Sequence, residues 1–435
     1  MQVKISLVQL SKLISLLLIA TISFQNIRLL FLGPLVLSIT NLFLLINLVV
    51  LLTYVARKEK IVIGRYQMPY VAILSGFGAL AVLSCIWHAR FEVVAPIASS
   101  MLLTLLIVAS IREINIRYWE AAILLSAVLA VIFAIGHSAN LIPLFGFEGP
   151  VPHRGKILPI DLKQGYTGLI GTRGSYGILC ILGIVVGLWW WRCGSIPRKL
   201  VALSSILAII FSVALSLSRS TWLAIGITMF AYIPLRWMVA GTSRYNRLNR
   251  GVIIAVVVAF IGMWLALYGV PSSVSDSYNL MVSIRERSVE SRWSQYQAAL
   301  DLSVNAPIFG LSSSQMERLF SEHVLHNSML AVLLEIGIFP LIFFVALHAW
   351  LIKDLIKIAL VDSYYENRLR AAVWLSGLFG VIVEMSLFRG YQTNMFWVFV
   401  GLLVADIIRM RRGVSFKCDR VANSGFLGSP RPGGS

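Results

Sequence analysis

Long apolar runs alternate with short polar or charged breaks along most of the chain. A helix needs about 20 consecutive apolar residues to cross the hydrocarbon core of a bilayer. Counted on that basis, the pattern predicts twelve membrane-spanning helices and hence an all-α polytopic membrane protein. Their approximate ranges are 6–24, 29–55, 70–87, 93–111, 121–138, 169–191, 201–218, 221–239, 251–270, 329–351, 371–388 and 395–408.

Two long polar segments interrupt this series, at about 139–168 and 271–328, and both fall on the same predicted side of the membrane. In the second segment, Val289, Trp293 and Tyr296 recur at helical spacing beside the charged stretch IRERSVESR. This combination predicts an amphipathic helix that lies on the membrane surface.

The basic residues predict the orientation of the chain. With a cytoplasmic N-terminus, Lys and Arg are roughly twice as frequent in the inner breaks as in the outer ones, and an even number of spans returns the C-terminus to the cytoplasm. The run up to Phe24 has no clear cleavage site, so we expect a retained first span. We therefore expect one transmembrane domain over residues 1–412 and a cytoplasmic tail over 413–435, disordered because it is rich in Gly, Pro and Ser.

Composition agrees with the apolar pattern. The 435 residues are 58% hydrophobic and 13% charged, which excludes a water-soluble globular enzyme. The excess of 37 Lys and Arg over 19 Asp and Glu indicates membrane lipids, phosphates or diphosphates as partners, and no segment resembles a nucleic-acid module. There is no nucleotide-binding motif, and the close pair His323 and His326 lacks the further ligands of a zinc site. We expect neither a metal nor another cofactor.

Several arginines lie on the predicted outer side, against the usual charge bias. Ordinary solvated charge on long loops explains some of these cations, but Arg219 lies between two spans with almost no loop around it, where an unpaired charge is costly. Converging guanidiniums suit a diphosphate, as a ligand or as a leaving group. The candidates for this role are Arg173, Arg219, Arg285, Arg287 and Arg292.

One outer histidine, His326, precedes a predicted span. A histidine can remove a proton from a sugar hydroxyl near neutral pH. The alternative is that His326 only caps the helix or lies at the membrane interface.

Three motifs resemble the bacterial O-antigen ligase and polymerase superfamily. They are SLSRSTWL (Ser216 to Leu223), ESRWSQYQAALDLSVNAPIFGLSSSQ (Glu290 to Gln315) and HNSMLAVLLEIGIFPLI (His326 to Ile342). Their order on the predicted outer side matches the family, and the resemblance covers about residues 165–400. Arg173, in GTRGSYG, resembles a further family arginine.

The resemblance implies a GT-C type B fold in the bacterial inner membrane with a periplasmic active site. The implied reaction transfers an oligosaccharide from undecaprenyl diphosphate to an acceptor sugar hydroxyl, without metal or nucleotide sugar. Carried over by motif, Arg219 and Arg292 are catalytic arginines and His326 is the base; Arg285 and Arg287 are added because they lie close to Arg292 in the sequence. The implied partners are the lipid-linked oligosaccharide, an acceptor glycan and a chain-length regulator protein.

Three functions remain open on the sequence. A polymerase of O-antigen or exopolysaccharide repeats is favoured, because Pro340 departs from the ligase pattern and the interval from Arg292 to His326 is short for a ligase. A ligase that joins the glycan to lipid A core is the alternative. A lipid-linked glycan transporter or flippase is the third, although the acids within the spans are few and the cations of interest lie at the outer surface.

Overall fold

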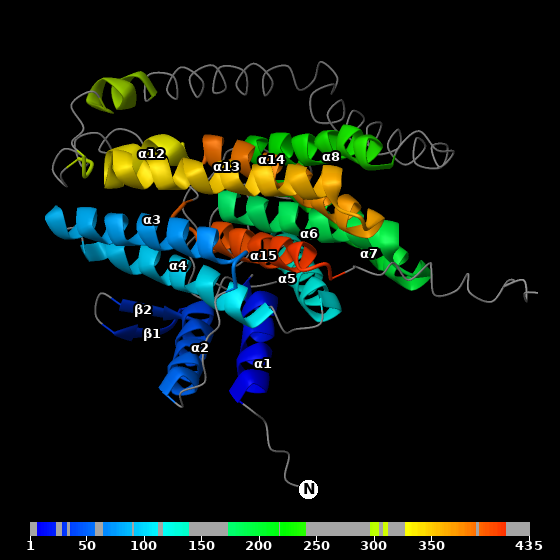
Figure 1. Ribbon diagram of the computed structural model, residues 1–435, viewed down its shortest axis with the longest axis horizontal. Helices are drawn as coiled ribbons and strands as arrows, with labels where there is room; N and C mark the ends of the chain where they lie inside the picture. Colours follow the sequence, from blue (N-terminus) through cyan, green and yellow to red (C-terminus); the bar gives the residue numbers. More distant parts are fainter. Residues whose placement is uncertain are drawn as a thin grey trace, which may run out of the picture.

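The chain folds into a bundle of long helices in the computed structural model (Figure 1). The residues that the structure describes are 7–22, 28–32, 35–56, 64–88, 91–111, 116–138, 173–216, 218–240, 296–303, 308–311, 327–388 and 391–414. Within these ranges, seven helices are long and apolar enough to cross a membrane: α3, α5, α6, α7, α8, α13 and α14. The protein is a helical, multi-pass membrane protein.

The elements follow one another along the chain as α1 (Leu7–Ala20), β1 (Arg28–Leu32), β2 (Leu35–Ser38), α2 (Ile39–Ala56), α3 (Met68–Trp87), α4 (Phe91–Ile111), α5 (Ile116–Ser138), α6 (Arg173–Cys193), α7 (Ile196–Ser216), α8 (Arg219–Ala240), α12 (Ser328–Ile336), α13 (Ile338–Val361), α14 (Tyr365–Leu387) and α15 (Asn394–Arg411). Eleven of the predicted apolar ranges overlap described helices. The predicted span 251–270 lies outside the described residues.

Two predicted spans differ from the structure. The range 29–55 is not one helix, because its first part forms an antiparallel hairpin in which Leu32 pairs with Leu35 and α2 begins only at Ile39. The two strands are joined in sequence by a Gly-Pro dipeptide, which is typical of turns.

The predicted span 329–351 is divided in two at Gly337. This residue has φ +104° and ψ 179°, a conformation that only glycine adopts readily, and it ends α12 and begins α13. The segment 308–311 packs into the break: Leu311 N donates to Leu334 O at 2.7 Å, and a Cβ on Gly337 would collide with Ile308 O.

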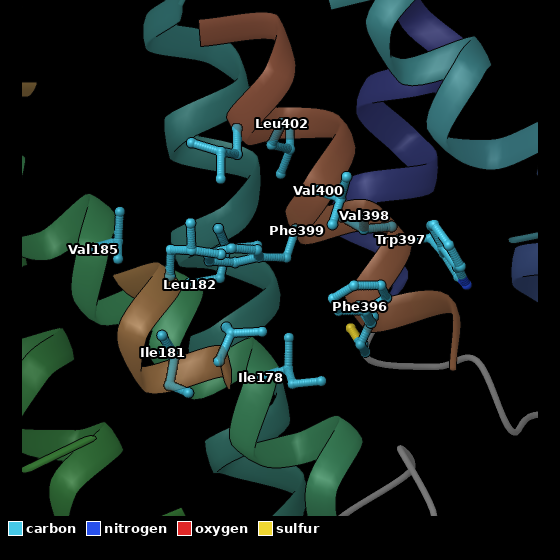
Figure 2. Packing of buried hydrophobic residues seen from close by; sticks show 14 of the residues in the cluster. Ile178, Ile181, Leu182, Val185, Phe396, Trp397, Val398, Phe399, Val400 and Leu402 are labelled. Atoms are coloured by element: carbon cyan, nitrogen blue, oxygen red, sulfur yellow. The ribbon is translucent and has the colours of Figure 1, made fainter. Parts of the chain in front are cut away.

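Apolar side chains from neighbouring helices fill the centre of the bundle. Figure 2 shows Ile178, Leu182 and Val185 of α6 in the same cluster as Phe396 and Phe399 of α15. Nearly every residue of α15 is buried, so this helix forms the axis of the core. By contrast, the outer faces of α7 and α8 expose large apolar side chains, as expected for helices that face lipid.

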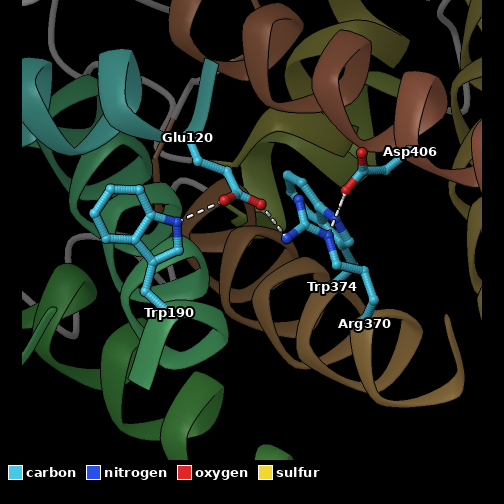
Figure 3. A network of polar contacts seen from close by, with 5 residues as sticks. All are labelled: Glu120, Trp190, Arg370, Trp374 and Asp406. Carbon is cyan, nitrogen blue, oxygen red and sulfur yellow. Dashed lines mark hydrogen bonds and ion pairs between the residues drawn. The ribbon is translucent and has the colours of Figure 1, made fainter. Parts of the chain in front are cut away.

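A buried ionic network joins four helices near one end of the bundle (Figure 3). Arg370 of α14 donates to Glu120 of α5 at 2.5 Å and to Asp406 of α15 at 2.7 Å. Trp190 Nε1 of α6 donates to Glu120 at 2.5 Å, and Trp374 Nε1 donates to Asp406 at 2.6 Å. The helix of the predicted span 371–388 begins earlier, at Tyr365, so Arg370 lies within α14, where it is buried.

These contacts define the two ends of the bundle. The network gathers the first turns of α5 and α14 and the last turns of α6 and α15. At the same end, Asp354 near the end of α13 accepts hydrogen bonds from Tyr70 at the start of α3 and from Arg411 at the end of α15. We call this the network end. The opposite end, where α6, α8 and α12 begin and α14 ends, is called the motif end, because the motif residues lie there. α12 is drawn at the left of Figure 1.

Candidate functional site

The candidate residues differ in how much the structure describes of them. Arg173 and Arg219 are the first residues of α6 and α8 at the motif end, but only their backbone is described. The candidates Arg285, Arg287, Arg292 and His326 lie outside the described residues. The described residues next to these candidates in the sequence show which helices the candidates lie beside.

The first turn of α8 contacts the last turns of α14 through a carboxylate. Ser220 Oγ and Thr221 Oγ1 donate to Glu384 Oε1 at 3.1 and 3.3 Å, and Ser218 Oγ lies 2.8 Å from Thr221 Oγ1. These hydroxyls come from the motif SLSRSTWL, on both sides of Arg219. The motif thus ties the start of α8 to Glu384.

The first turns of α6 approach the same place. A Cβ on Gly177 would lie 2.6 Å from Thr221 Oγ1 and 2.9 Å from Glu384 Oε1, so only glycine fits there without displacing a neighbour. A Cβ on Gly174 would overlap the ring of Phe388, which directly follows α14. Two glycines of GTRGSYG therefore allow the start of α6 to pack closely against α8 and α14.

The remaining two motifs also reach the end of α14. Asn327, which follows His326, caps α12 by accepting from Met329 N and Leu330 N at 2.9 and 3.1 Å. Ser328 Oγ donates to Phe388 O at 2.7 Å. Tyr296, four residues after Arg292, donates to Ser386 O at 3.4 Å.

Three helix N-termini thus contact one segment, the end of α14 from Glu384 to Phe388. A helix N-terminus carries a partial positive charge and exposed N–H groups, so three of them together favour an anion even before any arginine is added.

Glu384 is the functional candidate that the motifs alone do not single out. It is 0% exposed, and its Oε2 has no hydrogen-bond partner among the described residues. A carboxylate can accept several hydrogen bonds, so Oε2 is available to a hydroxyl group of a ligand. The described partners of Glu384 are two hydroxyls that lie 163 and 164 positions away in the chain.

Glu335, nine positions after His326, has a different role. It is buried and accepts hydrogen bonds from Tyr391 OH and, at 2.8 Å, from Gln392 Nε2. Glu335 thus links α12 to the segment between α14 and α15. The loop around Gly310 lies nearby: Ser84 Oγ of α3 donates to Phe309 O, and the Trp87 and Phe309 rings lie 5.4 Å apart.

No group of three His, Cys, Asp or Glu side chains is gathered closely enough to hold a metal in the described part of the chain. No known protein-family model matches the sequence, and the curated proteins contain no significant match.

Proposed function

We propose that the protein is a membrane glycosyltransferase that polymerises undecaprenyl-diphosphate-linked O-antigen or exopolysaccharide repeat units at the periplasmic face of the bacterial inner membrane. The proposal includes twelve spans, a GT-C type B fold and cytoplasmic termini. One observation supports it above the others: described neighbours of Arg173, Arg219, Arg292 and His326 all contact the end of α14.

In the proposed reaction, Arg219 and Arg292 hold the diphosphate of the donor, with Arg173, Arg285 and Arg287 as further diphosphate ligands. His326 takes the proton of the acceptor hydroxyl. The acceptor oxygen forms a bond to the anomeric carbon as the bond from that carbon to the diphosphate oxygen breaks, with inversion. Undecaprenyl diphosphate leaves with the bonding electron pair, and the arginines stabilise its charge. No metal or nucleotide takes part.

The three helix N-termini at the motif end support the anionic part of this scheme. They favour a diphosphate by the same electrostatics as the arginines. Glu384 supports the sugar part, since a carboxylate oxygen without a partner among the described residues suits a hydrogen bond to a sugar hydroxyl.

The test uses the purified full chain in detergent with undecaprenyl-diphosphate-linked repeat units, without metal or nucleotide. A ladder of products that is lost in His326→Ala and in Arg292→Ala is expected. Arg65→Ala is the matched control, because Arg65 is an exposed arginine just before α3, at the network end, and its loss should leave the ladder intact.

Adding lipid A core separates the alternatives. Product that forms only when the core is present would replace the polymerase by a ligase. Absence of product with either acceptor, together with movement of the lipid-linked glycan across a vesicle membrane, would replace both by a transporter.

A further inference from the structure

A second candidate site lies at the network end, far along α8 from Arg219. Arg236 is one turn before the end of α8 at Ala240 and is only 6% exposed. Its Nε is buried without a hydrogen-bond partner, and its guanidinium forms no ion pair with any residue that the structure describes. Burying the charge of an arginine without a compensating partner costs free energy in a membrane protein, and a bound anion would offset that cost.

The surroundings of Arg236 are cationic and phenolic rather than acidic. The groups close enough to act on its charge are Arg192 in the last turn of α6, Tyr232 one turn earlier on α8, and Tyr365 at the start of α14. Two guanidiniums and two phenol hydroxyls from three helices are all hydrogen-bond donors. None of these groups is a carboxylate.

Four of the five carboxylates described at this end have other partners, and the fifth, Glu366 in the first turn of α14, is not among the groups that act on the charge of Arg236. Glu120 and Asp406 bind Arg370, and Asp354 binds Arg411. Asp362 accepts from Tyr364 N at 2.8 Å and lies 3.4 Å from Asn367 Nδ2. These acids are therefore engaged elsewhere and do not neutralise Arg236.

The end of α8, which carries Arg236, is held to α13 and α14. Arg368 of α14 donates to Val239 O at the end of α8 at 2.9 Å and to Ala359 O of α13 at 3.1 Å. The position of Arg236 is thus built into the packing of the helix ends, at the depth where a membrane helix meets lipid headgroups.

We propose that Arg236 and Arg192 form a binding site for a phosphate group, of the class carried by anionic phospholipid headgroups. Arginine binds phosphate oxygens with its planar fork, and basic pockets between membrane helices on the cytoplasmic side bind such headgroups. The site is separate from the motif end, and the proposal does not depend on the glycosyltransferase reaction.

The test measures lipid binding to the full chain in detergent by native mass spectrometry and by the thermal unfolding midpoint. Three probes are compared: phosphatidylglycerol, diacylglycerol with the same acyl chains, and inorganic phosphate. Wild type should bind phosphatidylglycerol in preference to diacylglycerol, and Arg236→Gln should bind it about tenfold more weakly, the loss expected for charge-assisted hydrogen bonds.

Further variants and probes serve as controls for the loss of lipid binding. Lys357→Gln removes an exposed cation of α13 at the same end and should leave the affinity unchanged. Arg236→Lys keeps the charge without the fork, and should fall between wild type and Arg236→Gln. If inorganic phosphate alone protects wild type and not Arg236→Gln, the phosphate site stands with a soluble source. Equal affinity of wild type, Arg236→Gln and Arg192→Gln for phosphatidylglycerol would overturn the proposal.

Discussion

Replacing Arg370 by methionine is expected to destabilise the protein by about 3–5 kcal/mol, the usual cost of removing one partner from a buried ion pair. The structure favours the upper part of that range. Arg370 compensates two carboxylates, Glu120 and Asp406, which are almost fully buried. Its guanidinium also lies 5.3 Å from the ring centre of Trp119 and 4.8 Å from that of Trp189, and desolvated cation–π contacts contribute about 2 kcal/mol.

The assay is reversible unfolding of the full chain in mixed micelles, followed by tryptophan fluorescence. Trp190 and Trp374 donate directly to the network, so their emission reports on it. Combining Arg370→Met with Glu120→Gln and Asp406→Asn removes every charge of the triad and keeps acceptors for both indole N–H groups. Most of the stability should return, because replacing a whole buried ion network is often neutral or stabilising.

Lys357→Met serves as the control for loss of a cation, since Lys357 is exposed, and should change stability by less than about 0.5 kcal/mol. The reasoning is wrong if Arg370→Met costs less than about 1 kcal/mol, or if the triple variant is no more stable than the single one.

Four further predictions concern the helix break and the motif end. Gly337→Ala should lose about 1–3 kcal/mol in the same unfolding assay, because its φ of +104° strains any Cβ. Gly177→Ala should lower glycan transfer about tenfold or more by displacing Thr221 and Glu384, whereas Gly401→Ala, whose Cβ would only approach Ile107 at 3.2 Å, should transfer normally. Glu384→Gln should raise the KM for the acceptor with little change in stability, whereas Glu366→Gln at the other end of α14 should leave both the KM and the stability unchanged. An unchanged KM in Glu384→Gln would remove Glu384 from the site. Arg219→Lys should lose about 10²-fold in turnover if its fork binds the diphosphate, and activity equal to wild type would refute the bidentate contact.

The sequence predicts the helices well where length and hydropathy decide the structure. Prediction from the sequence fails where the conformation of a single residue determines the structure. Gly337 sits inside a continuous apolar run, so nothing in the hydropathy marks its positive φ or the packing of Ile308 against it. The hairpin before α2 is apolar on both strands, so it lacks the alternation that distinguishes a strand from a helix, and only the Gly-Pro dipeptide hints at a turn.

Long-range polar pairing is the second limit of prediction from sequence. Glu120 and Arg370 are 250 positions apart, and Ser220 and Glu384 are 164 apart. Each residue alone is a polar group near the end of an apolar run, which fits many arrangements. The partner becomes defined only when helices that are distant in sequence lie side by side. The motif resemblance points to the start of α8, but not to the carboxylate that α14 brings to it.

The two ends of the bundle differ in how their buried carboxylates are compensated. At the network end, the acids Glu120, Asp406 and Asp354 each have an arginine partner, so this end holds α5, α6, α13, α14 and α15 in one arrangement. At the motif end, Glu384 is bound through one oxygen only, by hydroxyls that carry no compensating charge. Such a carboxylate contributes less to stability than an ion pair would, and it leaves hydrogen-bonding capacity beside three helix N-termini. Asp406 Oδ1 at the network end also lacks a hydrogen-bond partner among the described residues, but Arg370 compensates the charge of that carboxylate, whereas no ion pair among the described residues compensates Glu384. The carboxylate without an ionic partner is therefore what favours the motif end, rather than the more highly charged network end, as the place of the proposed glycan transfer from a lipid diphosphate.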